Sequence, residues 1–470
     1  MAIARKIAYN VIFNAVTKIL STILALVGIG FITRYLGKEG FGDYSTVLAF
    51  FAFFGSVADL GIYAITAREI SRDEADEKKI LGNAFALRLT SSAAVFLITP
   101  ILIFFLPYSY DVKVGILIAA ASFVFSSTYM VLNGVFQKHL AMDKVATAEV
   151  IGKIIQIGII IFAVKKDLGF TIIILSILFA MIFNFVTILL MVNKYIPIRL
   201  QFDFAYWKKF LKESAPLGLS AIVIFVYFKI DTILLSILKT NAEVGLYNAA
   251  YKVIENVSFF PAMITGLMFP MFSRHIFSDK KHFFHLANQT MKVFVILVVP
   301  IVIGTLFLSE SIIRLIGGAA FLQSANTLRI LIFALAFIFF GGLFNNILIA
   351  SNNQRKMLRM LIACAVFNIT ANLIFIPTFS YTAAAIISTM TEFLVAFIGL
   401  ILVVKNTGYK PSVDNFPKIL LSGLAMAIFL FAFDSLGFAF LALGSTAVYL
   451  MFLWITKTIT IKELRSIVAR

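Results

Sequence analysis

The stretch Arg34-Tyr-Leu-Gly-Lys-Glu-Gly-Phe-Gly-Asp-Tyr44 decides the fold, because it separates two long apolar runs at 7–33 and 45–67. Each run exceeds the roughly 20 residues that an α-helix needs to cross a bilayer. The glycines in the stretch tolerate backbone conformations that other residues resist, which suits a tight reversal. The stretch therefore predicts a short polar turn between two antiparallel membrane helices.

A second copy of this turn lies near the middle of the chain, in Lys229-Ile-Asp-Thr-Ile-Leu-Leu-Ser-Ile-Leu-Lys-Thr-Asn-Ala-Glu-Val-Gly-Leu-Tyr247. Both copies end an apolar run, carry a Glu, and begin the next run with Gly-x-Tyr, at Gly42–Tyr44 and Gly245–Tyr247. A turn that recurs at half the chain length predicts an internal duplication.

The composition is that of a membrane protein. Hydrophobic residues make up 61% of the chain and charged residues 13%, with a mean hydropathy of +1.00. Soluble domains are about half apolar and about a quarter charged. The apolar runs are continuous and do not alternate, which excludes a β-barrel. The sequence therefore predicts an all-α polytopic membrane protein, and its single Cys364 allows no intrachain disulfide.

Fourteen apolar runs are long enough to be transmembrane helices. They cover 7–33, 44–67, 80–106, 112–137, 147–164, 169–193, 214–238, 246–272, 290–308, 327–350, 357–376, 381–404, 416–434 and 437–457. We expect an N-lobe of six helices at 1–200, a C-lobe of six at 201–405, and a two-helix extension at 406–470. An even number of helices in each half predicts a pseudo-two-fold axis along the membrane normal, with 196–213 as the hinge between the lobes.

The distribution of basic residues predicts the orientation. Alternate loops collect 28 Lys and Arg on one side and 7 on the other. The positive-inside rule then places both termini in the cytoplasm of a multi-pass protein of the cell membrane. Because topology explains most of the net charge of +17, we expect no nucleic-acid partner.

Several sequence patches resemble one family. They are Arg34–Tyr44, Asp59-Leu-Gly61, Arg68-Glu-Ile70, Lys229-Ile-Asp231, Gly245-Leu-Tyr-Asn-Ala-Ala-Tyr-Lys252 and Phe269-Pro-Met-Phe-Ser-Arg274. In these patches the chain resembles the Wzx-type polysaccharide flippases of the multidrug/oligosaccharidyl-lipid/polysaccharide (MOP) exporter superfamily.

This resemblance implies a V-shaped pair of six-helix lobes around a central cavity that opens alternately to the cytoplasm and to the outside. It also implies a cargo, an oligosaccharide linked by phosphate or pyrophosphate to a polyprenol, which moves from the cytoplasmic to the outer leaflet. The expected partners are this lipid-linked glycan, membrane lipids, a coupling ion (proton or sodium) and glycan-assembly enzymes.

The first apolar run carries a polar stripe. Asn10, Asn14, Lys18 and Ser21 are spaced by four, four and three residues and so share one helical face. An ionised side chain at mid-bilayer costs roughly 2.5–3.5 kcal/mol, so it is kept where it faces water or a partner. Lys18 is predicted either to contact a lipid-linked phosphate or to form an ion pair with Asp59.

The seventh and eighth runs carry further charges. Lys252 and Glu255 are spaced to pair within one helix, and Lys252 is the counterpart that we assign to Lys18 in the second lobe. Lys229 and Asp231 are two residues apart and point to opposite sides, so each requires its own partner. We expect Lys229 to contact cargo, whereas Asp231 favours a structural ion pair.

Three charged residues remain within other runs. Glu392 is a candidate for ion coupling, since burial raises the pKa of a lone carboxyl group, although Thr389 and Thr391 could simply solvate it. Arg88 and Lys153 lie just inside the cytoplasmic edge. Either they snorkel to the headgroups or they line the cytoplasmic mouth of the cavity, where Arg88 would bind cargo.

Other polar residues have simpler predicted roles. The amides of Asn345, Asn346, Asn368 and Asn372 could bind sugars, but helix–helix hydrogen bonds are the commoner use. The histidines His139, His275, His282 and His285 fall in cytoplasmic loops without metal-ligand spacing. No Walker loop, Gly-x-Ser-x-Gly or HExxH motif occurs, so we expect no cofactor, no metal and no catalytic residue.

Alternative functions share much of this pattern. A MATE-like exporter of cationic drugs should have a cavity dominated by carboxylates, whereas the runs here hold at least as many bases as acids. A membrane-embedded glycan polymerase or ligase should have a large external loop, whereas the predicted external turns are short. A flippase for a peptidoglycan precursor would need the same physical features. Only the patches that resemble polysaccharide flippases separate the two functions.

The predicted orientation can be tested by cysteine labelling in a Cys364→Ala background. Single cysteines at Lys78 and Lys208 should react with a membrane-impermeant maleimide only from the cytoplasmic side, because basic loops stay inside. A cysteine at Gly40 should react only from outside. The reverse pattern would contradict both the orientation and the repeat symmetry inferred from it.

Overall fold

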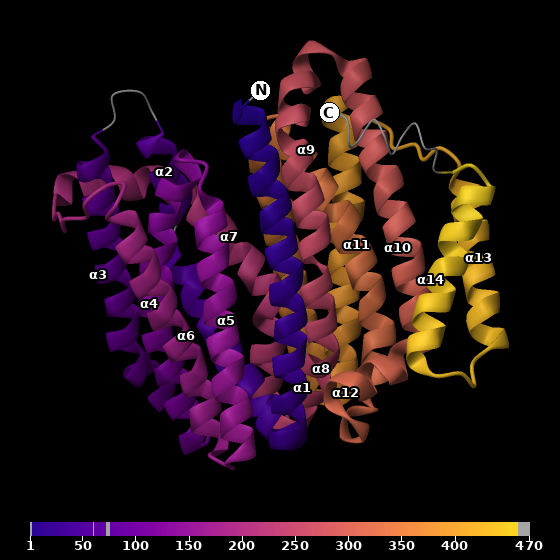
Figure 1. Cartoon of the computed structure of the whole chain (residues 1–470), viewed down its shortest axis with the longest axis horizontal. Helices are drawn as coiled ribbons and strands as arrows, with labels where there is room; N and C mark the ends of the chain where they lie inside the picture. Colours follow the sequence, from indigo (N-terminus) through magenta and orange to yellow (C-terminus); the bar gives the residue numbers. More distant parts are fainter. Residues whose placement is uncertain (1, 60, 72–75, 459–470) are drawn as a thin grey trace. The chain divides into compact units, whose positions relative to one another are not determined.

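The computed structural model describes residues 2–59, 61–71 and 76–458, apart from the side chains of 2–12, 15, 57–59, 64, 216, 217, 220, 221 and 227. Figure 1 shows long helices in both halves of the chain. The first half of the chain contains α1 (Ala2–Asp59), α2 (Ile62–Ile70), α3 (Glu77–Phe104), α4 (Tyr110–Lys138), α5 (Met142–Lys165), α6 (Gly169–Val192) and α7 (Phe204–Leu238). The second half contains α8 (Asn241–Val257), α9 (Phe259–Ser278), α10 (Lys280–Gly317), η1 (Ala319–Phe321), α11 (Ser324–Ala350), α12 (Gln354–Thr407), α13 (Phe416–Ala432) and α14 (Phe438–Ile455).

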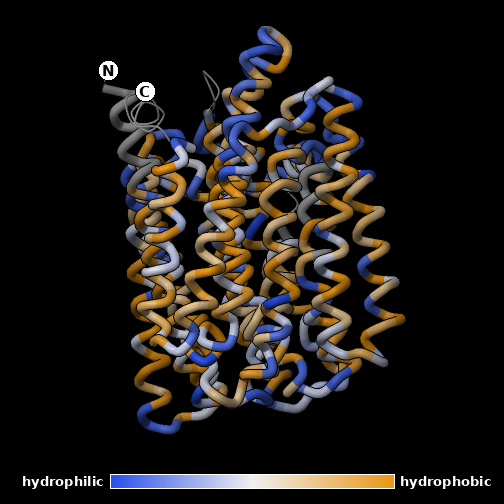
Figure 2. The backbone as a smooth tube through the Cα atoms, turned by 90° about the vertical axis from the view of Figure 1, so that its right-hand side faces the viewer, coloured by the Kyte–Doolittle hydropathy of each residue, from blue (hydrophilic) through white to orange (hydrophobic). Residues whose placement is uncertain are grey.

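The helices have the length and composition of membrane spans. Within the described part of the chain, ten helical segments are long and apolar enough to cross a bilayer. Figure 2 shows hydrophobic residues along the middle of the helices and hydrophilic residues concentrated towards their ends. The prediction of an all-α polytopic membrane protein is therefore confirmed, and each predicted run falls on a helix.

Two pairs of predicted spans are joined by shorter turns than the sequence suggested. In α1 only Gly37, with φ 68°, departs from helical geometry, so residues 38–43 already belong to the second arm. In α12 the spans 357–376 and 381–404 meet at Ser380, where φ is 51° and Pro377 lies just before. A single residue with positive φ is enough to reverse each helix.

Two other predicted spans are broken. The run 44–67 is divided between α1 and α2 at Gly61, which has a left-handed φ of 73°. The run 246–272 is divided between α8 and α9 at Ser258. Continuous hydrophobicity therefore concealed two interruptions, because hydropathy reports burial in lipid and not backbone direction.

The chain forms two compact units, 1–245 and 246–470. The first unit includes α7, which is held along its length. Arg68 Nη2 of α2 lies 2.8 Å from Glu213 Oε2, the rings of Phe53 and Phe225 are 5.7 Å apart, and Tyr108 and Ser236 share a 2.8 Å hydrogen bond. The unit therefore extends beyond residue 200, where we placed the end of the N-lobe; the lobe boundaries themselves stay a prediction.

Within the first unit the two copies of the repeated turn contact each other reciprocally. A Cβ atom at Gly42 would lie 1.8 Å from the carbonyl oxygen of Asn241, and one at Gly245 would lie 2.1 Å from that of Lys38. The same interval of 203 residues separates Lys38 from Asn241 and Gly42 from Gly245. Equivalent positions thus exchange the same contact, which is the signature of a local two-fold relation.

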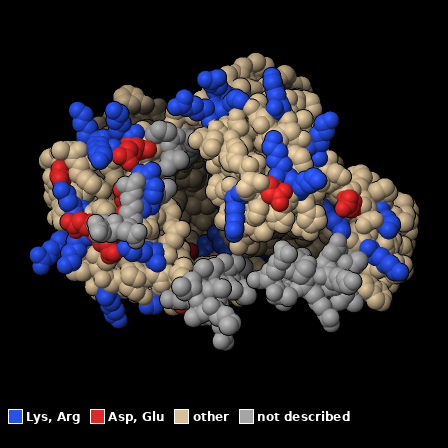
Figure 3. Space-filling view, turned by 90° about the horizontal axis from the view of Figure 1, so that it is seen from above, with Lys and Arg blue, Asp and Glu red and all other residues tan. Residues whose placement is uncertain are grey.

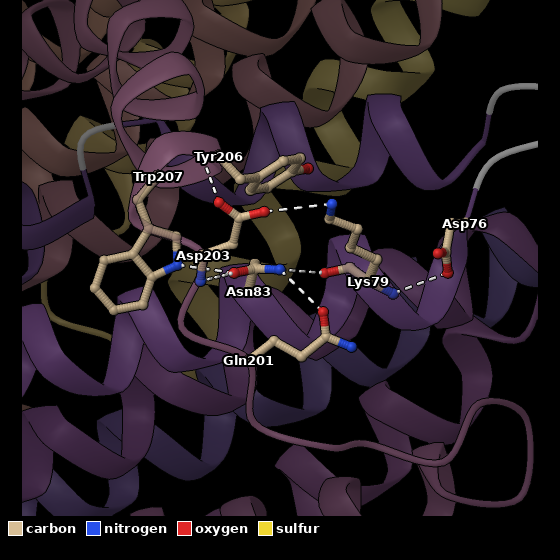
Figure 4. Close-up of polar contacts among 7 residues, drawn as sticks. All are labelled: Asp76, Lys79, Asn83, Gln201, Asp203, Tyr206 and Trp207. Atoms are coloured by element: carbon tan, nitrogen blue, oxygen red, sulfur yellow. Dashed lines mark hydrogen bonds and ion pairs between the residues drawn. The ribbon is translucent and has the colours of Figure 1, made fainter.

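At the opposite end of the unit, the segment between α6 and α7 is anchored to α3 (Figure 4). The buried Asn83 accepts bonds from the backbone N–H of Asp203 (2.9 Å) and from Trp207 Nε1 (3.1 Å). Its amide nitrogen donates to Gln201 Oε1 at 3.1 Å and to the Lys79 carbonyl at 2.9 Å. The segment predicted as a hinge is therefore attached to the first unit.

Asp203 strengthens this anchor by capping α7. Its carboxylate accepts a bond from the backbone N–H of Tyr206 and pairs with Lys79 at 3.3 Å (Figure 4). These contacts, the Tyr206 bond first, hold the pKa of Asp203 below its ordinary value. Because the charged form is the stabilised one, this contribution is present at neutral pH and is lost as the pH falls through the lowered pKa.

Replacing Gly42 or Gly245 by Ala should disrupt the reciprocal contact. Since the added methyl group would overlap a backbone carbonyl that cannot rotate away, the two turns must separate, at a cost of about 1–3 kcal/mol. The expected result is a lower melting temperature of the purified protein. Gly158→Ala in α5 is the matched control, because no atom lies within 4 Å of its Cβ position. An unchanged melting temperature for Gly42→Ala would contradict the close approach.

Replacing Asn83 by Ala should release the segment before α7. The change leaves Trp207 Nε1 and the Asp203 N–H without their buried acceptor, which costs about 1–3 kcal/mol. We expect faster proteolysis within 196–204 and a lower melting temperature. Asn346→Ala is the control, since the Asn346 amide donates to a carbonyl of its own helix, that of Gly342. Equal effects of the two variants would argue against the anchor.

Candidate functional site

Basic side chains gather on one end face of the molecule. Figure 3 shows Lys and Arg side chains on the surface seen from above, with fewer Asp and Glu side chains among them. The candidate site residues differ from these, because they lie within apolar helices and away from the helix ends.

Lys18 is an exposed side chain on the first arm of α1, and Asn14 and Ser21 are half-buried beside it. The exposed side chain fits the predicted polar stripe, although the side chain of Asn10 lies outside those that the structure describes. The side chain of Asp59 is also outside the described residues, so the predicted Lys18–Asp59 pair stays a prediction.

The packing of α1 on α5 shows what lies level with Lys18. Gly28 of α1 faces Ile157 and Ile160 of α5, with the nearest atom 3.5 Å from its Cβ position. Further along both helices, Tyr35 donates a 2.6 Å hydrogen bond to Asp167. The two segments therefore run in the same direction. Because both rise 1.5 Å per residue, moving back ten positions from Gly28 brings Lys18 level with 147–150.

That register places Glu149 of α5 at the level of Lys18. The Glu149 side chain is exposed, and the charge of Lys18 acts on its carboxyl group. The charge of Glu149 also reaches Tyr63 of α2 and Tyr129 of α4. Four helices thus contribute polar groups to one region, which we call the Lys18–Glu149 site.

Glu149 is not among the site residues expected from the sequence, although one signal was present. It is an acidic residue inside the predicted span 147–164, where a charge requires a reason. Pairing it with Lys18 needed the register between helices far apart in the sequence, which hydropathy does not supply.

In α8 the predicted pair is present. Lys252 Nζ lies 2.7 Å from Glu255 Oε2, and the side chains are 14% and 35% exposed. The Lys252 carbonyl also accepts a hydrogen bond from Asn256. The helical pairing of Lys252 with Glu255 is therefore confirmed, while contact of Lys252 with a cargo stays a prediction.

Two further candidates on α7 differ in exposure. Lys229 is half-buried and Asp231 is buried, with 1% of its surface exposed. This difference fits their predicted orientation towards opposite sides of the helix. A buried Asp231 is suited to a structural ion pair, and a partly exposed Lys229 is suited to contact with a cargo. Both roles stay predictions.

Arg88 of α3 is buried, with 1% of its surface exposed, and its Nε donates to the Ser127 carbonyl of α4 at 3.2 Å. This placement differs from snorkelling to headgroups, which would leave the guanidinium exposed. The candidate binding role of Arg88 therefore requires a conformation in which it becomes accessible. Lys153 donates to Gln156 on its own helix at 2.9 Å.

Amide and hydroxyl groups join the two arms of α12. Asn372 donates to Asn368 Oδ1 and Asn368 donates to Thr391 Oγ1, both at 3.0 Å. Asn368 therefore has the predicted helix–helix role, whereas Asn372 donates within its own arm and Asn346 within its own helix. Glu392 is buried beside Thr391, while Thr389 and Thr391 each donate to a carbonyl of their own helix. Ion coupling by Glu392 stays a prediction.

Metal binding has no structural support in the part of the chain that the structure describes. No group of three or more His, Cys, Asp or Glu side chains is placed there to hold an ion. The rings of His275 and His282 are 4.5 Å apart, and His275 Nδ1 lies 2.9 Å from the Met271 carbonyl oxygen.

Comparisons with known proteins identify relatives of this chain. A family model described as polysaccharide biosynthesis protein matches residues 7–276. A putative O-antigen transporter from Shigella flexneri is 25% identical over 70% of this chain and 81% of its own length. A probable low-salt glycan biosynthesis flippase, Agl15 of Haloferax volcanii, is 22% identical over 78% of this chain and 77% of its length.

The fold has a solved counterpart. An inward closed structure of the lipid II flippase MurJ matches with a TM-score of 0.76 and 18% sequence identity, covering 98% of this chain and 100% of that one. At this identity the likeness shows the fold alone.

Proposed function

The chain belongs to the polysaccharide biosynthesis protein family, and from that premise we propose that it is a flippase for lipid-linked oligosaccharides. The cargo is an oligosaccharide linked by phosphate or pyrophosphate to a polyprenol. The protein moves it from the cytoplasmic to the outer leaflet of the cell membrane, with both termini in the cytoplasm. Relatives named as an O-antigen transporter and a glycan flippase support this proposal.

The observation that carries the proposal is a set of lysines within apolar helices. Lys18 is exposed and Lys252 is partly exposed on helical segments that are long and apolar enough to span a membrane, and Lys229 is partly exposed on α7. A phosphate carries its charge whichever sugars are attached, so fixed cations can serve glycans of any sequence. Lysine binds phosphate well as a point charge. We propose that these residues face a cationic cavity that opens alternately to each side.

Two structural features weigh against the alternative functions. The connections on the predicted outer face are short, for example 105–109 between α3 and α4 and 433–437 between α13 and α14. A glycan polymerase would need a larger external segment to hold its acceptor. A MATE-like drug exporter would need carboxylates facing its cationic cargo, whereas Lys18 is an accessible cation. We therefore favour transport of an anionic lipid.

The proposal predicts that Lys18→Ala or Lys252→Ala abolishes transport while folded protein remains in the membrane. Each Lys→Arg variant should keep part of the activity, because it keeps the charge. The measurement is flipping of a fluorescent polyprenyl-pyrophosphoryl disaccharide in proteoliposomes, read by dithionite quenching of the outer leaflet. Lys208→Ala, at an exposed position near the start of α7, is the matched control.

A purely structural role for Lys18 gives a different result. Removing one partner of an intramembrane pair leaves an uncompensated charge and destabilises the protein. Combining Lys18→Ala with Asp59→Ala or with Glu149→Ala would then restore both folding and transport. Such a rescue would end the cargo-binding claim for Lys18, whereas a well-folded but inactive double variant supports it.

A further inference from the structure

The Lys18–Glu149 site contains two accessible charges of opposite sign at one level of α1 and α5. The register follows from the contact of Gly28 with Ile157 and from the Tyr35–Asp167 hydrogen bond. Both side chains are exposed, unlike the buried Arg88 and Asp231. An exposed pair can separate and re-form, whereas a buried charge is fixed by its hydrogen bonds.

The groups that face Glu149 from the neighbouring helices leave Lys18 as its main electrostatic partner. Tyr63 from α2 and Tyr129 from α4 are neutral at physiological pH. From α6, Asn184 packs against Gly152, one helical turn from Glu149. On α5 itself, Lys153 is engaged with Gln156. Of the described residues, Lys18 is the cation whose charge acts on this carboxyl group.

We propose that Glu149 is the internal counter-ion of Lys18 and competes with the phosphate of the cargo for it. This inference rests on the proposed function, because it assumes that Lys18 contacts the cargo phosphate. In the empty protein Glu149 neutralises Lys18. A phosphate or pyrophosphate group, with more negative charge than one carboxylate, displaces Glu149 when it binds.

The competition gives the protein a means of releasing its cargo. An unopposed ammonium within the membrane would hold a pyrophosphate strongly and release it slowly. When the phosphate leaves, the Glu149 carboxylate returns to Lys18 and replaces the interaction that Lys18 has lost. Glu149 lowers the affinity of the site for phosphate by the same free energy by which bound phosphate weakens the interaction of Glu149 with Lys18, since binding effects are reciprocal, and weaker binding favours release. Glu149 therefore lowers the affinity for the cargo and raises the rate of turnover.

The test measures binding of farnesyl pyrophosphate to the purified full-length protein, with farnesol as the uncharged control ligand. Glu149→Gln should bind farnesyl pyrophosphate about five- to tenfold more tightly, the usual size of a coupling between two competing groups. Glu149→Asp should bind like the unchanged protein, because it keeps the carboxylate. Glu213→Gln, which removes an exposed carboxylate that pairs with Arg68, is the control and should change nothing.

Lys18→Gln should weaken binding, and the Lys18→Gln/Glu149→Gln variant should bind like Lys18→Gln alone. In the proteoliposome assay, Glu149→Gln should lower both KM and the maximal rate, since cargo binds tightly and leaves slowly. A merely structural residue would not produce this combination. Glu149→Met, of similar length, replaces Glu149→Gln should that variant fail to fold.

Two outcomes separate failure of this inference from failure of the proposed function. If Lys18→Gln weakens binding but Glu149→Gln leaves it unchanged or weaker, the counter-ion role is wrong and the phosphate contact stands. If Lys18→Gln leaves binding of farnesyl pyrophosphate unchanged, the phosphate contact at Lys18 is wrong, and the role of Glu149 is wrong with it.

Discussion

The close approach of two backbone turns is the constraint on which the first unit depends. Gly42 faces the carbonyl of Asn241 and Gly245 faces that of Lys38, at distances that leave no room for a Cβ atom. Small residues let membrane helices approach in this way, because lipid supplies no hydrophobic force between them. The reciprocal contact joins the two copies of the turn within the first unit. It explains why a glycine precedes the x-Tyr positions in both turns.

The charges within the helices follow a second constraint, since each must be paired or reach water. Arg88 meets it by burial against the Ser127 carbonyl, and Lys252 meets it by pairing with Glu255. Lys18 and Glu149 meet it while both stay exposed. The interaction of two exposed charges is weaker than that of a buried ion pair, about 1 kcal/mol or less. That weakness suits the exchange of an internal partner for a ligand that we propose for Lys18.

The spans could be predicted from sequence because each is a continuous apolar run, whereas the details within them depend on contacts that hydropathy does not contain. The reversals at Gly37 and Ser380 change backbone direction without changing composition, and Ser258 separates α8 from α9 within one apolar run. The Lys252–Glu255 pair was predictable because it lies within one helix. Glu149 was not, because its partner depends on how α5 aligns with a helix more than a hundred residues earlier. Local spacing predicts local contacts, and only the packed structure supplies the rest.

The two attachments of α7 differ in strength, and this difference bears on the proposed alternating access. Near its start, Asn83 collects hydrogen bonds from Asp203, Trp207 and Gln201, and Lys79 adds an ion pair. At its far end Ser236 shares one hydrogen bond with Tyr108, and the close contact of Gly245 with the Lys38 carbonyl belongs to α8, the next helix. If α7 moves relative to α1 during transport, the far end separates first, because fewer polar contacts hold it. That end is the predicted outer face, where an outward opening must begin.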